Sequence, residues 1–176
     1  MESRICLIRH GITEGNKNKL YYGFADIPLA EEGIYQLKEL AAAGIYPEGD
    51  GADFYTSGLK RTEQTLELIY GQRKHETLES LREINFGDYE MKSHGELKDS
   101  EEYRIWRSDV MGSLAHHERA DGFTNEIVRD WKYLKNEACR KMLAMRHKDQ
   151  DALSITVCHG GTISSHTGEH IPRREG

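Results

Sequence analysis

The chain has 176 residues, of which 37% are hydrophobic and 31% are charged, and its formal net charge is -6. This length favours one domain over residues 1–176 with a sizeable core, and the negative charge argues against nucleic acid as a partner, because that binding needs a basic face. The apolar runs are too short to cross a bilayer and the N-terminus is a poor secretory signal, so we expect a cytoplasmic protein without a membrane partner.

Elements of two kinds alternate along the chain. Apolar, β-branched or aromatic runs at 4–8, 53–57, 76–81 and 153–158 predict strands, and apolar stripes of helical spacing predict helices over 31–45, 59–71 and 124–147, with Gly71 ending the second. This alternation predicts a three-layer α/β/α sandwich with a mostly parallel central sheet. The polar segment of about 85–123 predicts an irregular cap or long loop over one rim.

Polar side chains follow the ends of three predicted strands. Arg9 and His10 follow the first strand, Arg61 opens the helix after the 53–57 strand, and His159 and Gly160 follow the last strand. In open α/β sheets, ligands bind beyond the carboxyl ends of the strands. We therefore expect these side chains to meet at one rim.

These residue types point to phosphate chemistry. Arginine presents forked donors that match phosphate oxygens, and histidine acts as a nucleophile or donor near neutral pH. Glu83, in "LREINFG", offers a general acid, although it can also form a local ion pair with Arg82. "HGG" at 159–161 opens a predicted helix, and helix N-termini bind anions. Together they predict a phosphate pocket with a nucleophile and an acid.

Other chemistries fit the sequence less well. Cys6, Cys139 and Cys158 are odd in number and lack C-x-x-C spacing, which favours reduced thiols. None of them has an arginine at the sixth following position, which excludes cysteine-phosphatase chemistry. No H-E-x-x-H or EF-hand motif is present, and "HHE" at 116–118 is typical of a solvated face, so we expect no metal and no cofactor.

Five stretches in order, "LIRHGITEGN", "GFADIPLAEEGIYQ", "TSGLKRTEQT", "LREINFGDYE" and "VCHGGTI", resemble the histidine phosphatase superfamily, the phosphoglycerate mutase-like proteins. The resemblance runs from residue 4 to about 163. It implies that His10 is the nucleophile that carries a phosphohistidine, and that Glu83 protonates the leaving group and then activates water. It also implies a set of phosphate-binding residues, Arg9, Asn16, Arg61, His159 and Gly160, and substrate contacts beyond the phosphate by Tyr22 and Gly23.

Two stretches depart from the family pattern. "DGFTNE" at 121–126 stands where relatives carry a Gly-Glu-Ser run. We expect Asn125 or Glu126 to take the place of that run, and the choice between them stays open. The ending "SSHTGEHIPRREG" replaces an apolar helix and strand, which predicts a truncated C-terminus. We expect a phosphomonoesterase acting on a small phosphorylated metabolite. A phosphoglycerate mutase-type enzyme and a non-catalytic phosphate-binding remnant stay open as alternatives, as do the substrate and the oligomeric state.

Overall fold

A computed structural model of the chain describes residues 4–108 and 153–167, with side chains described up to residue 163. In chain order the elements are β1 (Arg4–Arg9), α1 (Glu14–Lys17), β2 (Leu20–Tyr21), α2 (Glu31–Ala42), β3 (Asp53–Thr56), α3 (Lys60–Tyr70), β4 (Glu76–Thr77), η1 (Glu79–Leu81), η2 (Gly87–Tyr89), β5 (Lys92–Ser93), α4 (His94–Leu97), α5 (Glu101–Ser108), β6 (Leu153–Cys158) and α7 (Gly160–Thr167).

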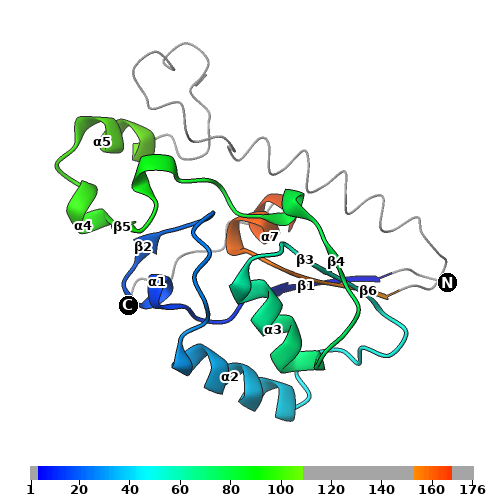
Figure 1. Ribbon diagram of the computed structural model, residues 1–176. Coiled ribbons are helices and arrows are strands. Elements are labelled where there is room, and N and C mark those ends of the chain that lie inside the picture. The colour runs from blue at the N-terminus through cyan, green and yellow to red at the C-terminus, as the bar shows by residue number, and fades with distance from the viewer. Residues whose placement is uncertain (1–3, 109–152, 168–176) are drawn as a thin grey trace.

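Within the described residues, the central sheet has four strands in the order β1-β6-β3-β4, and all three pairings are parallel. Helices α2 and α3 cover one face, and α7 lies on the other (Figure 1). The expected α/β sandwich with a mostly parallel sheet is therefore confirmed. The predicted strand over 76–81 is only partly present, because β4 ends at Thr77 and the chain turns into η1, which buries Leu81.

Residue alternation along β1 explains why both faces of the sheet are covered. Ile5 and Leu7 pack in a cluster with Ile163 of α7, whereas Cys6 and Ile8 pack in a second cluster with Leu66 of α3. A strand buried on both faces reads as a continuous apolar run rather than as an alternating one. This is why "ICLI" indicates a parallel strand covered on both faces, although β1 is an edge strand of the described sheet.

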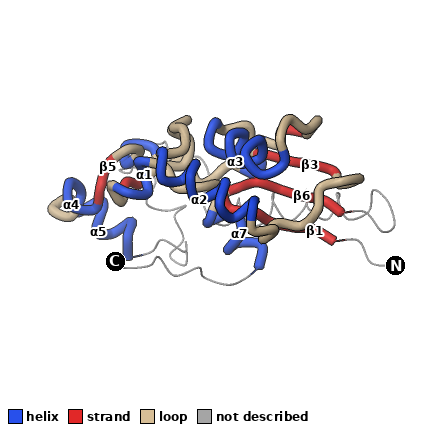
Figure 2. Tube along the Cα trace, turned by 90° about the horizontal axis from the view of Figure 1, so that it is seen from below, coloured by secondary structure: helices blue, strands red, loops and turns tan. Residues whose placement is uncertain are grey.

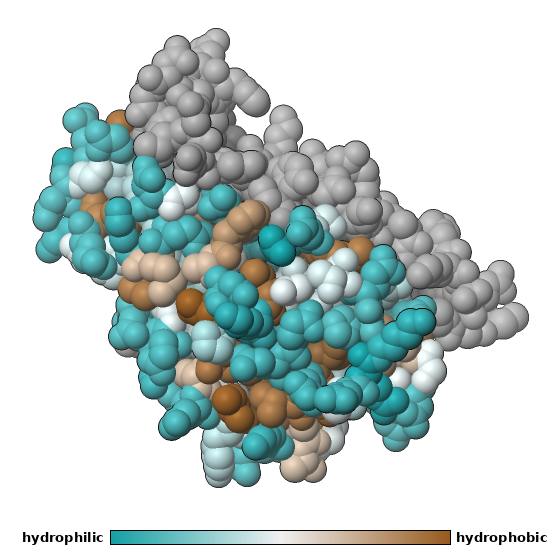
Figure 3. All heavy atoms as spheres, in the orientation of Figure 1, coloured by the Kyte–Doolittle hydropathy of each residue, from teal (hydrophilic) through white to brown (hydrophobic). Residues whose placement is uncertain are grey.

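The surface helix α2 is less buried than its apolar stripe predicts. Among its expected core positions Leu37 is buried, while Ile34, Leu40 and Ala41 are only partly buried. The face seen in Figure 3 is largely hydrophilic, with hydrophobic side chains in small separate groups.

Helix α3 buries Thr62 and Leu66 as predicted, and Gly71 follows its last residue with a φ of 72°, a conformation that favours glycine.

The segment expected to be irregular contains several elements in its described part, and this expectation is wrong for residues 87–108. Ser93 caps α4 in a reciprocal box with Glu96, and α5 buries Tyr103 and Trp106 on one face. Their core is aromatic and also includes Tyr21 of β2, which pairs with β5 in a two-stranded antiparallel sheet. Figure 2 shows this unit beyond the carboxyl ends of the central strands.

Several expectations fall on other parts of the chain. The predicted helix over 124–147, the "HHE" stretch, Asn125, Glu126, Cys139 and the C-terminal tail after Thr167 all lie outside the described residues.

Candidate active site

The register of the parallel strands brings two histidines together. Arg9 of β1 pairs with Cys158 of β6, so that His10 and His159 follow at the same level. The backbone N–H of His10 donates to the Cys158 carbonyl at 3.1 Å, and the two imidazole ring centres lie 5.2 Å apart at 61°. Both side chains are buried, at 8% and 1% exposure.

The hydrogen bond at one ring nitrogen of His10 defines the state of the other. Nδ1 lies 2.8 Å from the carbonyl oxygen of Gly11, and a carbonyl only accepts, so Nδ1 carries the proton. Nε2 then keeps its lone pair in the neutral ring. Burial, together with the charges of Arg61 and Arg9, lowers the pKa of His10 to about 3. The ring is therefore neutral near pH 7, as a nucleophile requires.

Arg61 is a fully buried cation at this site. Its Nη1 donates to the Ala25 carbonyl at 2.8 Å and its Nη2 to the Gly23 carbonyl at 2.7 Å, and its guanidinium lies 5.0 Å from the Tyr22 ring centre. Its Nε has no hydrogen-bond partner among the described residues. A buried donor without a partner is costly, and an anionic ligand would satisfy it.

Glu83 brings a carboxyl group to the start of α7. Its Oε2 accepts from the Gly161 N–H at 2.8 Å and its Oε1 from the Ile84 N–H at 3.1 Å. Burial raises the pKa of Glu83, and these two N–H groups and the charges of Arg61 and Arg9 oppose that rise. A carboxyl with a raised pKa beside two arginines is suited to donating a proton and taking it back.

A chain of hydroxyl groups orients His159. Thr62 Oγ1 donates to the Leu59 carbonyl at 2.7 Å, so it accepts from Ser57 at 3.1 Å. The Ser57 oxygen then accepts from His159 Nε2 at 2.8 Å. This order places a proton on Nε2 of His159, the tautomeric detail that decides how such a ring presents itself to a ligand.

Asn16 and Tyr22 meet through Thr13, which caps α1. The N–H and hydroxyl of Thr13 lie 3.0 and 3.1 Å from Asn16 Oδ1, and Thr13 Oγ1 lies 2.6 Å from the Tyr22 hydroxyl. Because Oδ1 is held by this capping box, the amide nitrogen of Asn16 is the group left for a ligand. Tyr22 is buried and its ring centre lies 6.4 Å from that of His10.

Of two glycines in the predicted site, Gly23 is enclosed by its neighbours, whereas Gly160 is in ordinary contact with Arg9. A Cβ on Gly23 would collide with the carbonyl of Ile84, so a side chain has no room there. A Cβ on Gly160 would lie 3.4 Å from Nε of Arg9, which places the start of α7 beside that arginine. A substrate contact by Tyr22 and Gly23 stays a prediction.

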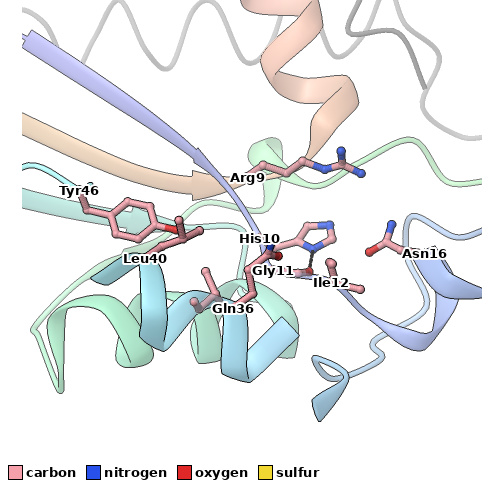
Figure 4. Close-up of a pocket in the computed structure, with 9 residues that line it drawn as sticks. Arg9, His10, Gly11, Ile12, Asn16, Gln36, Leu40 and Tyr46 are labelled. Carbon is pink, nitrogen blue, oxygen red and sulfur yellow. Dashed lines mark hydrogen bonds between the residues drawn. The ribbon is translucent and has the colours of Figure 1, made fainter. Parts of the chain in front are cut away.

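A cavity of about 310 Å³ opens beside the end of β1. Figure 4 shows the side chains of Arg9, His10 and Asn16 around one space, with the guanidinium of Arg9 above the imidazole and the Asn16 amide across from it. On the other side, α2 lines the cavity through Gln36 and Leu40. Within residues 4–108 and 153–167, no group of three or more His, Cys, Asp or Glu side chains is arranged to hold a metal.

The structure thus brings together the predicted residues of three strand ends and adds others that sequence reasoning missed. Thr13 and Ser57 had local signals, a T-x-x-N cap and a strand end. Gly161 lies in the "HGG" stretch that was predicted to open an anion-binding helix, but its partner Glu83, 78 residues away, was not predicted. Glu90, which binds the 23–25 loop, had no local signal, because its partners there are up to 67 residues away in the chain.

The model of the histidine phosphatase superfamily (branch 1) matches residues 5–170. The chain belongs to this superfamily. Among curated relatives, the adenosylcobalamin/alpha-ribazole phosphatase of Salmonella typhimurium is 31% identical over 179 residues, which cover 98% of this chain and 87% of that protein. The 2,3-bisphosphoglycerate-dependent phosphoglycerate mutase of Treponema denticola is 35% identical, over 59% of this chain and 45% of the mutase.

Solved structures of the superfamily share the fold. The alpha-ribazole phosphatase from Shigella flexneri matches with a TM-score of 0.71 and 25% identity, over 91% of this chain and 75% of that one. The phosphoserine phosphatase from Entamoeba histolytica, in complex with 3-phosphoglyceric acid, matches with a TM-score of 0.70 and 25% identity, over 93% and 77%. These relatives support phosphoryl-group chemistry in general, and they include both phosphatases and mutases. No helix in the described ranges has the length and apolar content of a membrane span.

Proposed function

We propose that this protein is a metal-independent phosphomonoesterase that hydrolyses a small phosphorylated metabolite through a phosphohistidine on His10. The observation that carries the proposal is the neutral His10 ring, which presents Nε2 while Nδ1 donates to the Gly11 carbonyl. The free thiols of Cys6 and Cys158 favour a cytoplasmic location.

In the first step, Nε2 of His10 attacks phosphorus. The N–P bond forms, the bond from phosphorus to the leaving oxygen breaks, and Glu83 gives its proton to that oxygen. Arg9 and Arg61 bind the phosphoryl oxygens, where the charge spreads in the transition state. His159 binds them by donating from Nδ1 when that nitrogen is protonated as well. The raised pKa of Glu83 supports the role of proton donor, because it extends the protonated form to higher pH.

In the second step, the Glu83 carboxylate takes a proton from water. The water oxygen bonds to phosphorus, the N–P bond breaks, and inorganic phosphate leaves with His10 neutral again. The Gly161 and Ile84 N–H groups hold this carboxylate in place and favour its ionised form, which is the form that acts as the base.

Phosphate release is favoured over mutase-type transfer by the comparisons. The phosphatase relative aligns with 98% of this chain and the mutase relative with 59%. The activities of these relatives suggest alpha-ribazole phosphate, phosphoserine and phosphoglycerate as first substrates to test.

The test is release of phosphate from p-nitrophenyl phosphate in EDTA by the wild type, by His10→Ala and by His75→Ala, a partly exposed histidine bound to Glu63. We expect activity in EDTA for the wild type and His75→Ala, and its loss in His10→Ala. The uncatalysed reaction is among the slowest that enzymes accelerate, by up to ~10²¹-fold, so the background is negligible. Folded wild type without turnover would favour the non-catalytic phosphate-binding protein, and activity only with a bisphosphorylated activator would favour the mutase.

A further inference from the structure

The carboxylate of Glu90 collects backbone N–H groups from two loops. Its Oε1 accepts from Gly23 at 2.9 Å, from Phe24 at 3.0 Å and from Phe86 at 2.9 Å, and its Oε2 accepts from Gly23 and Ala25, each at 3.1 Å. Four N–H donors on one carboxylate use nearly all of its lone pairs. Glu90 therefore has little capacity left to bind a substrate itself.

The same short loop, residues 23–25, binds Arg61 through its backbone carbonyls. The N–H groups of residues 23–25 point to Glu90, while the carbonyls of Gly23 and Ala25 accept from the two terminal nitrogens of Arg61. Arg61 is fully buried and cannot replace those bonds with water. The position of its guanidinium therefore depends on the position of the two carbonyls.

Among the described residues, loop 23–25 forms no regular hydrogen-bonding ladder that would hold it without Glu90. It follows β2, which pairs with β5 only at Leu20 and Tyr21, and it precedes α2. Charge-assisted hydrogen bonds are roughly twice as strong as neutral ones, so one carboxylate on several N–H groups is an effective anchor. Gly23 also packs directly on the Ile84 carbonyl, and this contact keeps the loop close to the segment that carries Glu83.

We propose that Glu90 is a positioning residue of the phosphate site: it holds loop 23–25 so that the two carbonyls present Arg61, with its unpartnered Nε, to the phosphoryl group. This inference rests on the proposed function for the identity of the ligand. In this proposal Glu90 does not contact the substrate. Its anchoring role gives a reason for a carboxylate to lie close to an anion site, even though its negative charge repels an anionic ligand.

The chemistry of the carboxylate makes the proposal specific. In Glu90→Gln, one of the two oxygens becomes an NH₂ group, which must face backbone N–H groups as donor against donor. Glu90→Asp keeps both acceptors but shortens the side chain by one methylene. Glu39→Gln, at an exposed position on α2, makes the same chemical change away from the loop.

The test is a double-mutant cycle between Glu90→Gln and Arg61→Lys, which keeps a charge but cannot reach both carbonyls. Orthovanadate affinity and kcat/KM are measured for each protein, and folding is checked by thermal unfolding. In the wild-type background we expect Glu90→Gln to weaken vanadate binding and kcat/KM by about 10- to 100-fold, since small displacements of binding groups have effects of this size. In the Arg61→Lys background the same change should cost less than about threefold, and Glu39→Gln should change neither quantity.

Equal losses in both backgrounds would overturn the proposal, because Glu90 would then act independently of Arg61. If Glu90→Gln does not fold, Glu90→Asp takes its place in the cycle, and failure of both to fold would show a structural role instead. Wild type that binds vanadate without turnover would refute the proposed function alone, and the affinity cycle would still decide the role of Glu90. Wild type that binds no vanadate would overturn both.

Discussion

Replacement of Gly161 by alanine is expected to lower the activity of this protein without lowering its stability. Gly161 is the second residue of α7, and its N–H donates to the Glu83 carboxylate. A Cβ at this position would lie 2.8 Å from Cδ and from Oε2 of Glu83, and closer still to Oε1. The group in the way is the end of a flexible side chain, so the carboxylate moves and the backbone does not.

The size of the effect follows from that displacement. Ordinary contact between heavy atoms is about 3.5–4.0 Å, so the carboxylate must retreat by about 1 Å. A misplacement of about 1 Å in a reacting group costs about 100-fold in rate, or about 2.7 kcal/mol of transition-state stabilisation. Alanine is a better helix former than glycine by about 0.5–1 kcal/mol, so the free energy of unfolding should stay equal or increase.

The assay is the pH dependence of kcat for Gly161→Ala, with urea unfolding of the same sample. Loss of the Gly161 hydrogen bond removes an influence that lowers the pKa of Glu83, so the pH at which kcat falls on the basic side should rise. The control is Gly95→Ala in α4, where the new Cβ meets only Ser93 Oγ, at 3.7 Å. Wild-type kcat in a stable Gly161→Ala protein would refute the role of Glu83.

One titration and two substitutions test the rest of the site. The pKa of His10 should be about 3 by NMR titration of its ring, and a normal pKa would contradict this prediction. Between about pH 6.5 and 3 the unfolded state then binds more protons than the folded state. The free energy of unfolding should therefore fall with decreasing pH, by up to about 1.4 kcal/mol per pH unit. Ser57→Ala removes the acceptor that orients His159, so kcat should fall about 10-fold with KM nearly constant, and a change confined to KM would count against orientation. Gly23→Ala places a Cβ against the backbone carbonyl of Ile84, so we expect a loss of at least about 2 kcal/mol in urea unfolding, and wild-type stability would show that the loop can move.

The sequence by itself determined the central sheet and the location of the site. The runs at 4–8, 53–57 and 153–158 carry apolar, aromatic or β-branched residues on successive positions at 5–8, 54–56 and 155–158, which is the pattern of strands covered on both faces. Once these strands are parallel, their carboxyl ends lie at one edge, and the residues that follow them must meet there. Arg9, His10 and His159 could be placed at one rim for this reason alone, whereas their direct juxtaposition follows from the pairing of β1 with β6 in the structure.

The contacts that tune the site were decided only by the tertiary structure. The hydroxyl chain behind His159 depends on a contact with Ser57, 102 residues away in the chain, that no local pattern encodes. The elements around α5 formed where the polar composition predicted none, because a few aromatic residues such as Tyr103 bury each other across long sequence separations. Glu90 is the clearest example, because an acidic residue on a polar stretch becomes an anchor only when a loop more than 60 residues away folds onto it.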